Sequence, residues 1–176
     1  MDINIRQEKQ KDYKIVENII KLAFENEEYS DHKEHFLVEK LRKSNSFIKE
    51  LSLVSEINGK IVGHILFTKI IIKGEGVEVE SLALAPVSVL PEYQGKGIGS
   101  RLITEGLKIA KDLGFLSVIL LGHPSYYPRF GFYPTSKWNI KSPFDVDEEF
   151  FMGLELKKGS LENINGTVIY PDEFLN

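Results

Sequence analysis

The sequence predicts a mixed α/β fold, with a central mixed, twisted sheet and helices on both of its faces. Two observations predict it. β-rich runs and helical patterns alternate along the chain, and residues 82–121 run in the order strand, glycine-rich loop, helix, strand. That order is typical of two parallel strands joined by a right-handed crossover. The 176 residues can bury one sizeable core, so we expect one domain over 1–176.

Composition excludes several classes of protein. The formal net charge of −4 argues against broad electrostatic binding to nucleic acid. Cysteine is absent, which excludes disulfides, thiolate catalysis and cysteine-ligated metal. The first residues are polar, and no run approaches the ~18 apolar residues of a membrane span. We therefore expect a cytoplasmic protein with neither nucleic acid nor a membrane as partner.

The N-terminal part begins with a short strand and continues into helices. Residues 2–6 alternate as in a strand, and the apolar spacing over Tyr13–Phe24 predicts a helix with Asp12 as its N-cap. A second short helix is expected to begin near residues 30–31 and to run through Leu41. The first half of the chain therefore supplies two helices next to the predicted sheet.

The middle of the chain is rich in β-structure. Residues 51–57 and 60–72 form two such runs, and Asn58-Gly59 between them is a strong hairpin signal. A turn over 73–76 leads into a third run at 77–90, which ends almost wholly apolar, as in a strand entering the middle of a sheet.

The second half supplies one more helix and further strands. An apolar stripe from Ile98 to Leu113 predicts the helix, and Gly114 is placed to end it. Residues 115–121 form a fully apolar strand, and further strands are expected at 150–157 and 166–170.

Three alternating glycines, Gly95, Gly97 and Gly99, stand between a strand and a helix. Free backbone N–H groups at a helix N-terminus carry about half a positive charge and suit a phosphate, and glycine permits its close approach. The alternative is a tight strand–helix connection that binds nothing.

Two common phosphate motifs do not fit this loop. A P-loop needs Ser or Thr after the lysine, but Lys96 is followed by Gly97, and no glycine stands five residues before Gly95. A dinucleotide fingerprint would need glycine where Ser100 or Leu102 stands.

The pattern that does fit is Q-x-x-G-x-G, beginning at Gln94. With the preceding V-L-P-E-Y it resembles the GNAT N-acetyltransferase superfamily. The resemblance implies that the βαβ unit binds acetyl-CoA as cosubstrate. It implies a pyrophosphate site at Gln94, Gly95, Lys96, Gly97, Ile98, Gly99 and Ser100. It also implies that the pantetheine arm binds at the end of the preceding strand, at Val87, Ser88 and Val89.

A second segment carries the resemblance further. Tyr127, Gly131 and Phe132 fit the family pattern Y-x-x-x-G-F, and L-L-G-H-P-S-Y-Y-P-R-F-G-F resembles the YhbS-like branch. The resemblance implies that Tyr127 donates a proton to the departing thiolate. The alternative is a packing role. Arg129 could clamp an anion, but we favour a role in holding the turn, and Phe132 with Phe130 is expected in the core.

The sequence identifies no general base. The position at which the family commonly carries its carboxylate base falls on Ala83, which has no acidic group. We expect the side chains of Glu78 and Glu80 to be solvated. We expect His123 to have a structural role or to contact a ligand. His64 lies within an apolar strand and is expected to be a satisfied core histidine.

Two other groups of polar residues are weaker candidates. Asp31-His32 and His35 could place two imidazoles on one helical face, but no third ligand follows, and no metal is expected. The acidic run at 145–149 favours a solvated loop, with attraction of cationic substrates as the alternative.

These features predict an acetyl-CoA-dependent N-acetyltransferase that moves an acetyl group directly to a primary amine, of a small molecule or a protein. The absence of cysteine favours direct transfer over a thioester intermediate. The alternative is a non-catalytic CoA-binding sensor or interaction module. Acyl chain length and acceptor stay open, and the aromatic C-terminal half could support a homodimer.

Overall fold

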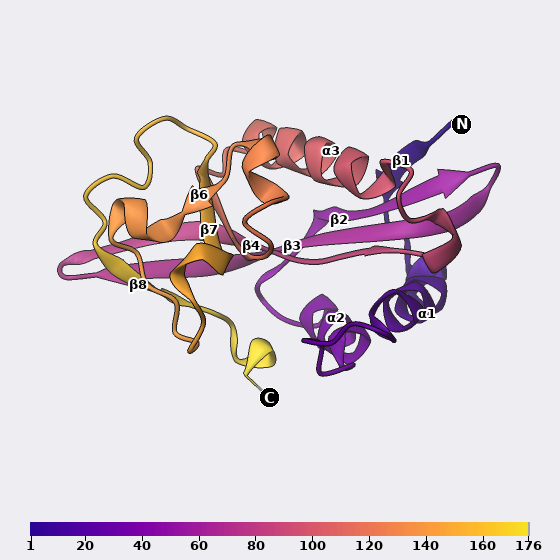
Figure 1. Ribbon diagram of the computed structural model, residues 1–176, viewed down its shortest axis with the longest axis horizontal. Coiled ribbons are helices and arrows are strands. Elements are labelled where there is room, and N and C mark those ends of the chain that lie inside the picture. Colours follow the sequence, from indigo (N-terminus) through magenta and orange to yellow (C-terminus); the bar gives the residue numbers. More distant parts are fainter. Residues whose placement is uncertain (176) are drawn as a thin grey trace. The chain divides into compact units, whose positions relative to one another are not determined.

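The computed structural model describes residues 1–175 (Figure 1). Its chain forms two compact units. The first comprises residues 1–68 and 85–109, and the second comprises residues 69–84 and the chain from residue 110 onward. Two long strands, β3 (Lys60–Gly74) and β4 (Val77–Val89), contribute to both units.

In the first unit the strand order is β1, β2, β3, β4. Strands β1 and β2 pair antiparallel, as do β2 and β3. In this unit, α1 and α2 lie on one face of the strands and α3 on the other (Figure 1). The remaining bounds are β1 Asn4–Gln7, α1 Tyr13–Phe24, α2 Glu34–Arg42, β2 Phe47–Ile57 and α3 Ile98–Asp112.

The core of the first unit lies between these helices and the strands. Helix α1 buries Val16, Ile19 and Ile20, as its apolar spacing predicts. On the opposite face, a Cβ added at Gly106 of α3 would lie 2.8 Å from Cζ of Phe67 on β3. Glycine at this position therefore lets the helix lie close against the aromatic ring.

The hairpin between β2 and β3 confirms the turn that the sequence predicts. Asn58 and Gly59 have φ values of 51° and 78°, and Ile57 pairs with Lys60 across the turn. Two consecutive residues with positive φ are typical of a type I′ turn, whose twist matches that of the strands beside it.

In the second unit, β8 pairs with β3, and the order of the other strands is β4, β5, β7, β6. Strands β4 and β5 are parallel, with Leu82 opposite Val118, which confirms the expected pairing of the βαβ unit. Its core contains Trp138, Phe151 and Tyr170. The bounds are β5 Ser117–Leu121, β6 Tyr133–Pro134, β7 Phe151–Glu155 and β8 Gly166–Ile169.

The N-cap predicted for α1 is confirmed in its position. Asp12 stands at the N-cap of α1, but its side chain makes no cap hydrogen bond there. Its carboxylate accepts instead from the Lys9 backbone N–H at 2.8 Å and from Arg6 Nη1 at 2.7 Å. A buried carboxylate gains more from a guanidinium than from a neutral amide, and the Arg6 hydrogen bond lowers the pKa of Asp12.

Residues 1–175 contain eight strands in a mixed sheet, so the predicted mixed α/β class is confirmed. Within the same range, each helix is too short or too polar to cross a bilayer. Helix α2 begins at Glu34, later than expected, and β6 was not predicted.

Candidate coenzyme site and reaction centre

The glycine loop leaves the sheet at the end of β4. A short 3₁₀ turn over Pro91–Tyr93 follows the strand. The Gln94 side chain then reaches back, its Nε2 donating to the Val89 carbonyl oxygen at 3.0 Å. Gln94 thus ties the loop to the last residue of the strand.

Gly95 and Gly97 require their glycine identity for backbone reasons. Their φ values are 76° and 82°, in the left-handed region that other L-residues rarely adopt. Among the described residues, no atom lies within 4 Å of a Cβ added at either position. Because the space beside both glycines is open, a ligand can approach the backbone closely.

Helix α3 begins directly after these glycines. Ile98 is buried and anchors the helix start, and the Arg101 N–H donates to the Gly97 carbonyl at 3.1 Å. Backbone N–H groups at a helix N-terminus precede the first intrahelical hydrogen bond, and the helix dipole makes this end positive. Lys96 adds an exposed positive charge. This geometry and charge suit a phosphate or pyrophosphate.

The end of β4 combines half-buried and buried residues. Val87 and Val89 are partly exposed, whereas Ser88 between them is only 1% exposed. The Ser88 hydroxyl is buried and has no hydrogen-bond partner within residues 1–175.

Tyr127 lies in the second unit, at the start of a 3₁₀ turn over Tyr127–Phe130. Its ring packs edge-on against Tyr126 at 5.0 Å and Phe132 at 6.0 Å between centroids. A Cβ added at Gly122 would lie 2.6 Å from its Cδ2, so glycine there makes room for the ring.

Burial, with a smaller effect of Tyr126, raises the pKa of Tyr127 to about 12. The phenol therefore keeps its proton at neutral pH and is available as a hydrogen-bond and proton donor. This state is the one that the predicted role requires.

The neighbours of Tyr127 have structural roles. Arg129 donates from Nε to the Tyr126 carbonyl at 2.8 Å, and its guanidinium lies 4.4 Å from the centroid of the Tyr126 ring. It holds the turn, as the sequence favours. Phe132 is 1% exposed and belongs to the core, while Phe130 is half-buried.

A family model described as an acetyltransferase (GNAT) domain matches residues 4–135. The chain belongs to the GNAT acetyltransferase family. The predicted superfamily is thereby confirmed.

Two relatives in Escherichia coli K12 are similar in sequence to this GNAT chain. YjhQ, an uncharacterised N-acetyltransferase, is 43% identical over 118 residues, which are 66% of this chain and 65% of YjhQ. The match thus spans just under two thirds of that relative. YhbS, also an uncharacterised N-acetyltransferase, is 28% identical over 138 residues, 78% of this chain and 81% of YhbS.

Two solved structures have the same fold. The crystal structure of E. coli YhbS in complex with CoA has a TM-score of 0.87 and 26% identity, covering 99% of this chain and 92% of that one. A GNAT family acetyltransferase from Brucella melitensis in complex with acetyl-CoA has a TM-score of 0.81 and 34% identity, covering 98% of both chains. The similarity to YhbS supports the predicted branch.

No general base emerges at the position where GNAT enzymes commonly carry one. Ala83 is 2% exposed and lies in the core of the second unit. Glu78 and Glu80 are exposed on β4. His123 is exposed too, and its ring lies 6.1 Å from that of Phe150.

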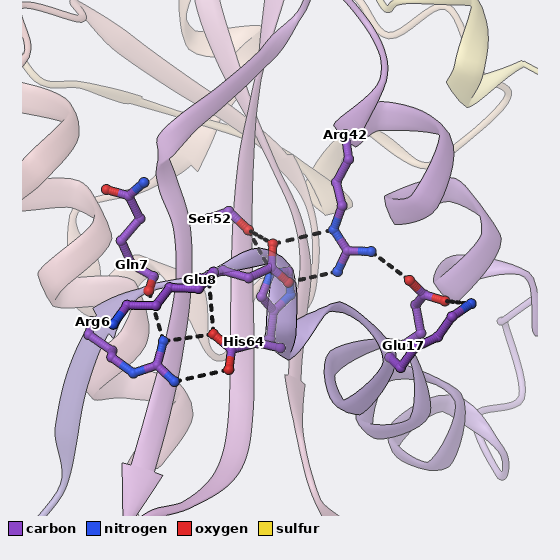
Figure 2. Close-up of polar contacts among 10 residues, drawn as sticks. Arg6, Gln7, Glu8, Glu17, Arg42, Ser52 and His64 are labelled. Carbon is purple, nitrogen blue, oxygen red and sulfur yellow. Dashed lines mark hydrogen bonds and ion pairs between the residues drawn. The ribbon is translucent and has the colours of Figure 1, made fainter.

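A buried ionic network in the first unit was missed by sequence reasoning (Figure 2). Arg42 of α2 donates through Nη2 to Glu8 at 2.6 Å and through Nη1 to Glu17 of α1 at 2.6 Å. The Ser52 hydroxyl donates to Glu8 at 2.8 Å and contacts His64 Nε2 at 2.9 Å. The side chains of Glu8 and Arg42 are 1% and 4% exposed.

His64 is fully buried, but the expectation of a satisfied core histidine is wrong for one of its nitrogens. Its Nδ1 is buried and finds no partner in the part of the chain that the structure describes. Burial, with a smaller contribution from Arg42, lowers the pKa of His64 to about 3, so the ring is neutral at physiological pH.

The histidines near α2 do not form a metal site. His32 has a φ of 60°, and its Nδ1 lies 3.0 Å from the Phe24 carbonyl oxygen. Across residues 1–175, no group of three or more His, Cys, Asp or Glu side chains is placed to hold a metal ion.

Proposed function

We propose that this protein is an acetyl-CoA-dependent N-acetyltransferase that moves an acetyl group directly to a primary amine. The observation that carries the proposal is the glycine loop, with open space beside Gly95 and Gly97 and donors at the start of α3. The CoA and acetyl-CoA in the YhbS and Brucella melitensis structures support the same cosubstrate.

In this proposal two portions of the coenzyme, its pyrophosphate and its pantetheine arm, bind different parts of the first unit. The pyrophosphate accepts hydrogen bonds from the loop of Gln94, Gly95, Lys96, Gly97, Ile98, Gly99 and Ser100. The pantetheine amides pair with the strand end at Val87, Ser88 and Val89, in the way that a peptide adds to a sheet edge.

The reaction forms a bond between the amine nitrogen and the acetyl carbon and breaks the bond from that carbon to sulfur. Tyr127 donates its phenolic proton, or a hydrogen bond, to the departing thiolate. The amine must attack in its neutral form, and the proton that it loses leaves through solvent, because no side chain is assigned as base. No acyl-cysteine can form, since the chain contains no cysteine.

Release of the CoA thiol from acetyl-CoA, measured against a panel of primary amines of small molecules and peptides, tests this function. Acetylated product with at least one amine supports it. Unaltered thermal stability of the protein at saturating acetyl-CoA would overturn it, because a ligand that binds the native state must stabilise it.

A second function has one observation in its favour. Core residue Ala83 stands where a carboxylate base would be expected, which favours a CoA-binding module without transferase activity. Acetyl-CoA binding without turnover of any amine would support the module, and turnover would exclude it.

Three further predictions concern the whole protein. We propose that residues 1–176 act as one domain, that the protein works in the cytoplasm, and that it forms a homodimer through its aromatic C-terminal half. A monomer mass in analytical ultracentrifugation at micromolar concentration would contradict the dimer.

A further inference from the structure

The polar network of Figure 2 determines which nitrogen of His64 carries the proton. The Ser52 hydroxyl has one proton, and it donates that proton to Glu8 at 2.8 Å. The same oxygen lies 2.9 Å from His64 Nε2 and must therefore accept from it. In the neutral ring, Nε2 then carries the hydrogen and Nδ1 presents a lone pair.

Arg42 holds the other end of this chain of hydrogen bonds. Its Nη2 and Nε donate to the two oxygens of Glu8 at 2.6 and 3.3 Å. The carboxylate is thus paired with a positive charge and serves as an acceptor for Ser52. A fixed acceptor at Glu8 gives Ser52 a fixed orientation, and Ser52 in turn selects the tautomer of His64.

Ser88 of β4 lies beside His64 of β3. The Leu90 N–H donates to the Val62 carbonyl at 2.9 Å, and in an antiparallel pair such a bond joins opposed residues. The short turn at 75–76 makes the neighbouring strands β3 and β4 antiparallel, so a step from Val62 to His64 along β3 corresponds to a step back from Leu90 to Ser88 along β4. This register places Ser88 opposite His64. In agreement, a Cβ added at Gly63 would lie 3.0 Å from the Ser88 carbonyl oxygen.

The two side chains share one face of the sheet. Ser88 and Leu90 are two residues apart and so point the same way, and Leu90 lines a cavity with Ile15 and Ile19 of α1. His64 is on this face too, because it is linked through Ser52 and Glu8 to Arg42 of α2.

The two atoms are complementary in chemistry. Within residues 1–175, neither the lone pair of His64 Nδ1 nor the hydroxyl of Ser88 has a hydrogen bond. Directly opposed Cβ atoms lie about 4.5–5.5 Å apart, within reach of one bond after rotation of the hydroxyl or of one bridging water. Buried polar groups are rarely left unpaired.

We propose that His64 and Ser88 are positioning residues for the pantetheine arm: the Ser88 hydroxyl donates to His64 Nδ1, directly or through one water, and so fixes the backbone at Val87–Val89. The role rests on the proposed function, in which this strand end binds acetyl-CoA. The network from Arg42 to His64 supplies the rigid acceptor. Neither residue touches the reacting atoms.

Substitutions at the two positions test the pair. Ser88→Ala removes the hydroxyl that donates to His64 Nδ1. His64→Gln removes the acceptor, because the glutamine amide reaches the position of Nε2 and not that of Nδ1. Each is expected to raise the KM and Kd for acetyl-CoA about 3–10-fold, the range for one hydrogen bond, with kcat changed less. The double variant is expected to be no worse than either single variant.

Two further variants provide rescue and control. Ser88→Cys keeps a weak donor at nearly the same volume and is expected to fall between wild type and Ser88→Ala. Ser55→Ala removes an equally buried hydroxyl that also lacks a partner in the described chain. The Ser55 side chain faces Gly63 and Leu102 of α3, on the opposite face, and its loss should leave the KM for acetyl-CoA unchanged.

Nitrogen NMR of the imidazoles in the full-length protein gives a readout that core packing alone does not predict. His64 should show a protonated Nε2 and a bare Nδ1, and the Nδ1 resonance should move in Ser88→Ala. A protonated Nδ1, an Nδ1 resonance insensitive to Ser88, or an unchanged Kd in folded Ser88→Ala would overturn the positioning role alone. If wild type fails to bind acetyl-CoA, the proposed function fails, and the positioning role fails with it.

Discussion

The glycine loop and the buried network from Arg42 to His64 lie in the same unit and are built in opposite ways. The loop is exposed, contiguous in sequence, and works through backbone conformation at Gly95 and Gly97. The network is buried and joins Glu8, Ser52 and His64, which are far apart in the chain, through side chains. Backbone conformation within a contiguous stretch can therefore be predicted from sequence, whereas a side-chain network depends on how distant strands meet.

The buried network should contribute most to the stability of the fold. Arg42→Met should lower the free energy of unfolding by about 3–5 kcal/mol, because it leaves a buried carboxylate unpaired. Urea unfolding followed by circular dichroism measures it. Lys43→Met is the control, because it removes the charge of a neighbouring side chain that is 77% exposed. Its free energy of unfolding should stay within about 0.5 kcal/mol of that of the wild type. A loss below about 1 kcal/mol in Arg42→Met would show that the network adds little.

The next largest effect is expected at Tyr127, in the motif that ends at Phe132. Tyr127→Phe removes the proton donor but keeps the ring, so kcat should fall about 10²-fold with little change in the melting temperature. Steady-state rates with an accepted amine measure it. Tyr126→Phe is the matched control and should retain most of kcat. Equal rates in both variants would reduce Tyr127 to a packing residue.

A pair of glycine substitutions tests whether the loop acts on the ligand or only on the fold. Gly97→Ala and Gly76→Ala both place a side chain at positive φ, 82° and 70°, and each should cost about 1–2 kcal/mol of stability. In Gly97→Ala the Kd for acetyl-CoA should also rise at least about tenfold, the value of one hydrogen bond to a charged phosphate. Calorimetric titration of each variant with acetyl-CoA measures this difference in Kd. Equal affinity in both variants would leave the loop a structural turn.

The smallest effect is a pH dependence of stability from the network. The pKa of His64 is lowered to about 3 in the folded protein, whereas the same imidazole has its ordinary pKa of 6.5 in the unfolded chain. Between these values the unfolded state binds more protons, so stability falls as the pH decreases, by about 1 kcal/mol between pH 6 and pH 5. The charged groups facing the ring are Glu8 and Arg42. His64→Gln should flatten this slope and the exposed His123→Gln should not; an unchanged slope in His64→Gln would contradict the prediction.

The sequence predicted much of the fold because local patterns dominate there. The bounds of α1 follow from its apolar spacing, and the turn at Asn58-Gly59 follows from residues that tolerate positive φ. The two residues of β6 carry no periodic signal, so that strand was missed. Asp12 stands at the predicted N-cap of α1, but its carboxylate pairs with Arg6, a residue outside the helix that the local pattern does not indicate.

The sequence alone predicted the acetyltransferase family, a phosphate site at the loop of Gly95 and Gly97, and Tyr127 as candidate proton donor. The family and the role of Tyr127 follow from the resemblance of contiguous motifs, and the positive φ of Gly95 and Gly97 follows from the identity of those residues. The tertiary structure alone buries His64 Nδ1 with no hydrogen-bond partner within residues 1–175 and places Ser88 on the neighbouring strand. The register of β3 against β4 and the burial by α1 and α2 set that relation, and neither is encoded in any contiguous stretch of the chain.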